Sequence, residues 1–176
     1  DVPVKSDAIG PVARSTEPFI RQVFIARDVL NEGQFERKLY VIRKRVEKAI
    51  RESAIQGRDY FYVSSLSANT IVYKGLLLPH QMSAYYQDLK DERLTSALAL
   101  VHKRYSTNTF PTWPLAHPFR FMAHNGEINT LRGNINMMRS REMHIASPLF
   151  GENIKKLAPI HTEGASDSAI FDQSFE

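Results

Sequence analysis

Apolar side chains recur at the spacing of one helical face between residues 35 and 50, and this pattern constrains the fold more than any other. They are Phe35, Leu39, Ile42, Val46 and Ile50. Because residues three and four apart share a helix face, the pattern predicts an amphipathic helix after the turn-like residues 31–33. The opposite face is charged and is expected to face solvent: it carries Arg37, Lys38, Arg43, Lys44, Lys48 and Arg51, with Glu36, Glu47 and Glu52 among them.

Segments rich in aromatic and β-branched residues predict strands around this helix. The expected strands cover residues 19–27, 60–66, 70–74, 96–102 and 120–124, and the second and third pair as a hairpin. Shorter helices are expected at residues 79–89, at 131–143 after a Thr130 cap, and from residue 167 after a Ser166 cap. Since the elements come in mixed order without regular βαβ alternation, the sequence predicts an α+β layered architecture.

Composition sets wide limits on the class of protein. The chain has 176 residues, of which 43% are hydrophobic and 24% charged, so it is expected to form one folded domain or most of one. No run approaches the length needed to span a bilayer. The net charge is +4, but 19 acidic residues lie among the 23 basic ones, which argues against nucleic-acid binding. There is no cysteine, which excludes disulfides and thiolate metal sites within this sequence.

The polar residues 102–134 contain the main candidates for substrate binding. Three prolines at 111, 114 and 118 predict an irregular loop. Arg104 follows an expected strand, where its planar guanidinium could bind a carboxylate with two hydrogen bonds. Thr107 could offer a hydroxyl to the same ligand, and Asp167 could bind an α-ammonium group. Taken alone, charged residues such as Arg104 and Asp167 are more often exposed surface charges, and Thr107 is equally well a loop-stabilising threonine.

Asn125 and Gly126 form a candidate oxyanion hole. An Asn side-chain amide and a glycine N–H can both point at an oxygen that becomes negative during acyl transfer. Asn-Gly is also a common hairpin turn, so the dipeptide alone leaves both readings open.

Other motifs are weaker. His102, His117, His124 and His144 lack the spacing that places two imidazoles on one helix face, so structural or hydrogen-bonding roles are expected and no metal site is predicted. The glycines between residues 126 and 133 lack the pattern of a phosphate-binding loop.

Three segments resemble the glutaminase domain of the large subunit of glutamate synthase. They are SSLSANTIVYKG at 64–75, HKRYSTNTFPTWPLAHPFRFMAHNGEINTLRGN at 102–134 and EGASDSAIFD at 163–172. RYST followed by HNGEI is typical of class II glutamine amidotransferases, and the FPTWPLAHPFR insert resembles glutamate synthase in particular. Residues 1–176 are accordingly expected to be part of one glutamine amidotransferase type 2 domain.

The resemblance implies an N-terminal-nucleophile hydrolase fold, four layers αββα with antiparallel sheets, incomplete at both ends. In that family an N-terminal cysteine attacks the side-chain amide of L-glutamine and releases ammonia. The family assigns Arg104 to the glutamine carboxylate, Asp167 to its ammonium group, and Asn125 with Gly126 to the oxyanion; Thr107 is a weaker contact. Because the chain begins with Asp1 and has no cysteine, we expect a piece of a longer protein that does not hydrolyse glutamine alone.

The parent enzyme implied by the resemblance passes ammonia to 2-oxoglutarate in a synthase domain of the same chain. FMN, an iron–sulfur cluster, and an NADPH-dependent small subunit or ferredoxin belong to that parent by resemblance, and no cofactor is expected in this piece. A cytoplasmic location is expected, or a plastid in a plant or alga. The alternative is a non-catalytic module that binds glutamine.

Overall fold

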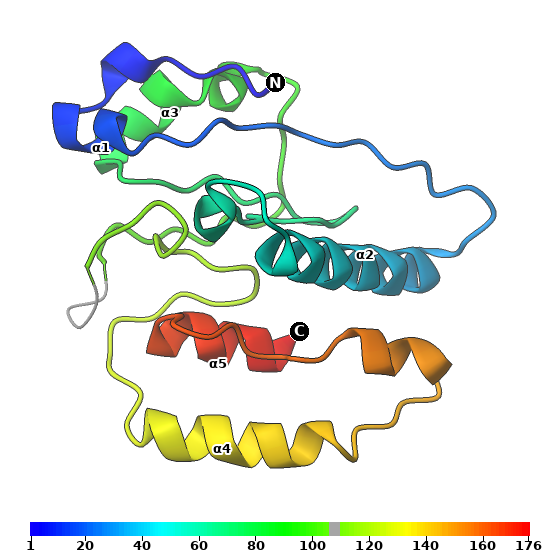
Figure 1. The fold of residues 1–176 in the computed structure, drawn as a ribbon. Coiled ribbons are helices and arrows are strands. Elements are labelled where there is room, and N and C mark those ends of the chain that lie inside the picture. The colour runs from blue at the N-terminus through cyan, green and yellow to red at the C-terminus, as the bar shows by residue number, and fades with distance from the viewer. Residues whose placement is uncertain (106–109) are drawn as a thin grey trace.

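The computed structural model describes residues 1–105 and 110–176. Its helices are short apart from two, and they are joined by long extended segments (Figure 1). In chain order, the described elements are η1 (Ser6–Ala8), α1 (Pro11–Ser15), α2 (Glu32–Glu52), η2 (Arg58–Tyr60), η3 (Pro79–Gln81), α3 (Met82–Tyr85), η4 (Gln87–Lys90), α4 (Leu131–Glu142), η5 (Gly151–Lys156) and α5 (Asp167–Phe175), where η marks a 3-10 helix.

Helix α2 confirms the helical pattern of the sequence. Asn31 caps it: its side chain accepts the Gln34 N–H at 2.9 Å, and the Gln34 side chain accepts the Asn31 N–H at 3.0 Å. Such a reciprocal pair satisfies N–H groups that have no partner inside the helix. Phe35 and Leu39 are buried on the predicted apolar face. The helix therefore starts where local hydrogen bonding favours it, and the first part of its apolar face is buried, whereas Val46 on the predicted face is exposed.

The predicted solvent exposure of the charged face of α2 is wrong for Arg43 and Lys44, which are 4% and 8% exposed. The Lys44 Nζ donates to the carbonyl oxygens of Pro159 and Ile160 at 2.7 and 2.9 Å. Burial, with the neighbouring Arg43 adding to it, lowers the pKa of Lys44 to about 8. These two side chains join α2 to the C-terminal part of the chain.

The predicted antiparallel sheets are absent from the described residues, so the four-layer αββα prediction is wrong for this structure. The only β-type pairing in the described chain is an isolated bridge between Val4 and Tyr86. A strand needs a ladder of backbone bonds to a neighbour. Here, side chains occupy backbone groups of the expected strands: Ser65 Oγ accepts the Val72 N–H at 3.2 Å, and Asp172 accepts N–H groups from residues 120–122.

The expected helix at residues 79–89 is also interrupted. It is divided into η3, α3 and η4, because Tyr86 has an extended backbone between the last two. Helices α4 and α5 confirm the two C-terminal predictions, and Ser166 caps α5 by accepting the Ala169 N–H at 3.2 Å. Thr130 precedes α4 with φ of 58°, and no described N–H group donates to its side chain, so the predicted cap is wrong.

The main apolar core lies where α1 and α3 pack together (Figure 1). Its buried members are Ile9, Ala13, Leu77, Tyr85, Tyr86 and Trp113. The Trp113 Nε1 donates to the Ala13 carbonyl at 3.1 Å, which ties the proline-rich loop to the N-terminal segment. A Cβ added at Gly75 would lie 2.4 Å from the Trp113 ring, so the indole requires glycine at that position.

Helices α4 and α5 run side by side below α2, and the C-terminus lies near α2 (Figure 1). An apolar cavity of about 180 Å³ separates α4 from α5, with Leu131 and Met138 on one side and Ile170 and Phe171 on the other. Among the described helices, none combines the length and apolar character that crossing a membrane requires.

Candidate active site

His102 lies at the centre of the candidate site. Its Nε2 is 2.8 Å from the Asn125 Oδ1 and 3.1 Å from the His124 carbonyl oxygen. Its Nδ1 accepts the Arg104 N–H at 3.2 Å. A single imidazole thus contacts the predicted oxyanion residue and the backbone of the predicted carboxylate-binding residue. Arg104, Asn125 and Gly126 are exposed, so their free polar groups face solvent.

Asp167 connects to the same region through Ser168. The Ser168 Oγ lies 2.7 Å from the His124 Nε2 and donates to the Asp167 Oδ1 at 3.1 Å. The other carboxylate oxygen accepts the Ile128 N–H at 2.9 Å. The start of α5 is therefore joined to both ends of residues 124–128, which contain Asn125 and Gly126.

Hydrogen bonding controls the charge state of Asp167. Burial acts to raise the pKa of its carboxyl, but the bonds from Ile128 and Ser168 outweigh burial, so the pKa falls below its usual value. The group is ionised at neutral pH and 9% exposed. A negative charge at this place is suited to an ammonium group, although both Asp167 oxygens already accept backbone N–H groups.

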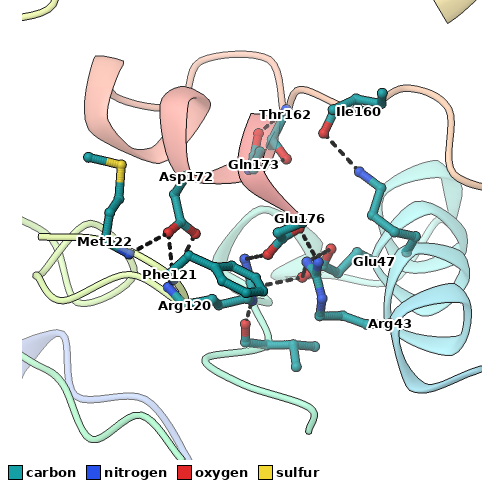
Figure 2. A network of polar contacts seen from close by, with 12 residues as sticks. Arg43, Glu47, Arg120, Phe121, Met122, Ile160, Thr162, Asp172, Gln173 and Glu176 are labelled. Carbon is teal, nitrogen blue, oxygen red and sulfur yellow. Dashed lines mark hydrogen bonds and ion pairs between the residues drawn. The ribbon is translucent and has the colours of Figure 1, made fainter. Parts of the chain in front are cut away.

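A second buried carboxylate, Asp172, holds the segment that leads into the site. Its Oδ1 accepts the N–H groups of Phe121 and Met122 at 2.8 and 3.0 Å, and its Oδ2 accepts that of Arg120 at 3.2 Å (Figure 2). Asp172 is 1% exposed. Since a carboxylate can accept several bonds at once, one side chain on α5 fixes the backbone just before His124 and Asn125.

Two arginines and two glutamates form an ion-pair network beside this carboxylate (Figure 2). Arg120 contacts Glu47 at 3.3 Å and Glu176 at 3.1 Å. Arg43 contacts Glu47 at 3.1 Å and also pairs with Glu176. The Arg120 guanidinium further donates to the Val63 carbonyl. Burial lowers the pKa of Arg120, and the two glutamates oppose that shift. The network joins α2, the end of α5 and residue 120.

His117 completes a group of three imidazoles. Its ring stacks on that of His102, with centroids 4.4 Å apart and planes 28° apart, and its centroid is 5.9 Å from that of His124. Burial lowers the pKa of His117 to about 4, and His102, His124 and Lys74 add to the effect. His117 is therefore neutral at pH 7. No described group of three or more His, Cys, Asp or Glu residues has the geometry to hold a metal ion.

The structure brings three of the predicted residues, Arg104, Asn125 and Asp167, around the histidines. Gly126 follows Asn125 in the same exposed segment. Thr107 lies outside the described residues. The sequence interpretation gave the histidines hydrogen-bonding roles in general terms, but it missed their grouping and the role of Asp172. No local signal marks Asp172, because its partners lie about fifty residues away.

Comparison with known proteins identifies the family. The family model of class-II glutamine amidotransferases matches residues 1–176, so the chain belongs to that family. Its relatives include glutamate synthases, which confirms the resemblance noted in the sequence. It is 56% identical over 177 residues to the NADPH glutamate synthase large chain of Bacillus subtilis, covering 99% of this chain and 11% of that protein.

Relatives with other electron donors are nearly as similar. The chain is 47% identical over 182 residues to the NADH glutamate synthase of Saccharomyces cerevisiae, covering all of this chain and 8% of that one. It is 44% identical over 178 residues to the chloroplastic ferredoxin-dependent glutamate synthase of Spinacia oleracea, covering 99% and 11%. The chain thus spans about a tenth of the length of these relatives.

Proposed function

We propose that this chain is part of the glutaminase domain of a glutamate synthase large chain, and that residues 1–176 belong to a single domain. The family match supports the hydrolysis of glutamine. The observation that carries the proposal is the bond between His102 and the Asn125 Oδ1 at 2.8 Å. It leaves the Asn125 Nδ2, the other branch of the planar amide, able to donate to a substrate oxygen.

In the proposed reaction, a cysteine thiolate from outside this sequence attacks the side-chain carbonyl carbon of glutamine. The carbonyl oxygen becomes negative, and Asn125 Nδ2 with the Gly126 N–H stabilises it. Arg104 binds the α-carboxylate, Asp167 attracts the α-ammonium group, and Thr107 offers a hydroxyl. The intermediate collapses as the carbon–nitrogen bond breaks, and the cysteine's own α-amino group, which took the thiol proton, passes it to the departing nitrogen. Ammonia leaves, and water hydrolyses the remaining thioester to glutamate and the free thiol.

The rest of the proposed activity belongs to the whole protein. Ammonia would pass to 2-oxoglutarate in a synthase domain that uses FMN and an iron–sulfur cluster, with NADPH, NADH or ferredoxin as the source of electrons. The present residues do not fit an iron–sulfur cluster, because the sequence has no cysteine and the described residues form no metal-binding group. We therefore assign no step in this chain to either cofactor.

Ammonia release from glutamine tests the proposal in the full-length protein that contains this sequence. Asn125→Ala removes the proposed oxyanion donor and is expected to lower kcat by about 100-fold or more. Arg104→Ala removes a substrate contact and is expected mainly to raise KM. Asn69→Ala is the matched control, since Asn69 is exposed in the turn at residues 67–69.

Unchanged kinetics in the Asn125 and Arg104 variants would refute the residue roles, and a wild-type protein that releases no ammonia would refute the function. The isolated 176-residue chain is expected to release none, because it contains no cysteine. Glutamine binding by that chain in calorimetry, without ammonia release in either form, would favour the non-catalytic glutamine-binding module.

A further inference from the structure

The hydrogen bonds of His102 determine which of its nitrogens carries the proton. The His124 carbonyl oxygen, 3.1 Å from Nε2, can only accept, so Nε2 must donate. The Arg104 N–H can only donate, so Nδ1 must be unprotonated. His102 is thus the neutral tautomer with hydrogen on Nε2. The Asn125 atom facing that hydrogen must be an acceptor, which fixes its amide with Oδ1 toward His102.

The ring plane of His102 is also held. His117 stacks on it at 4.4 Å and packs against the Phe119 ring at 4.7 Å. The Lys74 Nζ lies over the Phe119 ring, 4.9 Å from its centroid. His117 is 7% exposed. An imidazole fixed both in its plane and by hydrogen bonds at each nitrogen can orient its partners.

From these contacts we propose that His102 is a positioning residue of the glutaminase site, which sets the side-chain orientation of Asn125. The inference rests on the function proposed above. Its Nε2–H donates both to the Asn125 side chain and to the carbonyl of the residue before it. The Asn125 Nδ2 and the Gly126 N–H, the two proposed oxyanion donors, are thereby held in fixed positions relative to each other. Through Nδ1 the same ring fixes the backbone of Arg104, which binds the other end of glutamine.

Two substitutions test the roles of the two His102 nitrogens independently. Gln is long enough to place an amide N–H near the position of Nε2, so His102→Gln keeps the bond to Asn125. Asn is shorter and places its oxygen near the position of Nδ1, so His102→Asn keeps the acceptor for Arg104 but loses the donor. Both variants remove the ring that stacks on His117, so packing losses are shared.

The experiment measures glutamine-dependent ammonia release and thermal melting of the full-length protein carrying each variant. His102→Asn is expected to lower kcat roughly 10- to 100-fold with little change in KM, because a misplaced oxyanion donor acts on the transition state. His102→Gln is expected to retain a kcat at least about tenfold above that of His102→Asn. His80→Gln, at an exposed histidine in η3, is the control and should match wild type.

The possible outcomes separate this inference from the function beneath it. An active wild type with equal kcat in both His102 variants would overturn the positioning role alone. Equal loss in both variants with equally lowered melting temperatures would show a structural role and overturn it as well. A wild type that releases no ammonia would overturn the proposed function and this inference with it.

Discussion

Removing the Asp172 carboxylate should release the backbone that leads into the site. In Asp172→Ala, the N–H groups of Arg120, Phe121 and Met122 lose their acceptor, at present 2.8 to 3.2 Å away. A hydrogen bond contributes about 1 kcal/mol net, and more when the acceptor is charged. Since Phe121 is exposed and its N–H can bond to water, we expect a cost of about 3 kcal/mol for the three bonds together.

The conservative variant Asp172→Asn should incur only part of this cost. The amide keeps an oxygen at the place of Oδ1, which holds two of the three bonds, but its NH₂ faces the N–H of Arg120. We expect a cost of about 1 to 2 kcal/mol. Asp7→Ala, at an exposed aspartate in η1, controls for the loss of one negative charge.

Amide hydrogen exchange at residues 120–122 is the suitable measurement, because it reports local opening rather than global unfolding. A loss of 3 kcal/mol corresponds to exchange about 100-fold faster, and 1 to 2 kcal/mol to roughly 10-fold. Exchange that is unchanged in Asp172→Ala would refute the argument that this carboxylate holds the segment. Equal acceleration in Asp172→Ala and Asp7→Ala would assign the effect to net charge instead.

Three further predictions concern other contacts. Gly75→Ala should shift the fluorescence of Trp113 and destabilise the fold by about 1 to 3 kcal/mol, because the new Cβ would lie 2.4 Å from the indole; Gly10→Ala, with open space around it, should not shift the emission. His117→Phe should make the stability of the fold less sensitive to acid. The unfolded histidine binds a proton near its usual pKa of 6.5 and the folded one only near 4, so the wild type loses stability as pH falls between these values. The difference in urea midpoint between the two proteins should change in that pH window alone. Glu47→Ala removes a carboxylate that pairs with both Arg43 and Arg120, and should lower the free energy of unfolding by about 3 kcal/mol or more. A change below about 0.5 kcal/mol in urea unfolding would show that these ion pairs do not stabilise the fold.

Local patterns account for the parts of the fold that the sequence predicts well. The spacing of Phe35 and Leu39 and the Asn31 turn define α2, and Ser166 marks the start of α5. Each depends on residues within a few positions of one another. The candidate site was predicted differently: Arg104 and Asn125 have chemistry suited to a free amino acid, but only the resemblance to class II glutamine amidotransferases favoured a site over a surface charge and a turn.

Two of the failures have the same cause, which is competition from side chains far away in the sequence. The segment at residues 120–124 has strand-like composition, but Asp172 takes the N–H groups that a ladder would need. The charge pattern of α2 suggested a solvated face, yet Arg43 pairs with Glu176, which is 133 positions away. The neighbouring residues in the sequence do not indicate that Asp172 and Glu176 make these contacts. Local composition therefore favoured strands and exposed charges.

The pairing of Arg43 with Glu176 also has a kinetic consequence. Forming it closes a loop of 133 residues, and the entropy of closing such a loop must be lost before the contact stabilises anything. Contacts of this separation in sequence form late in folding, after local helices such as α2. Weakening the network should therefore accelerate unfolding while leaving the folding rate nearly unchanged, so its main effect is on the lifetime of the native state.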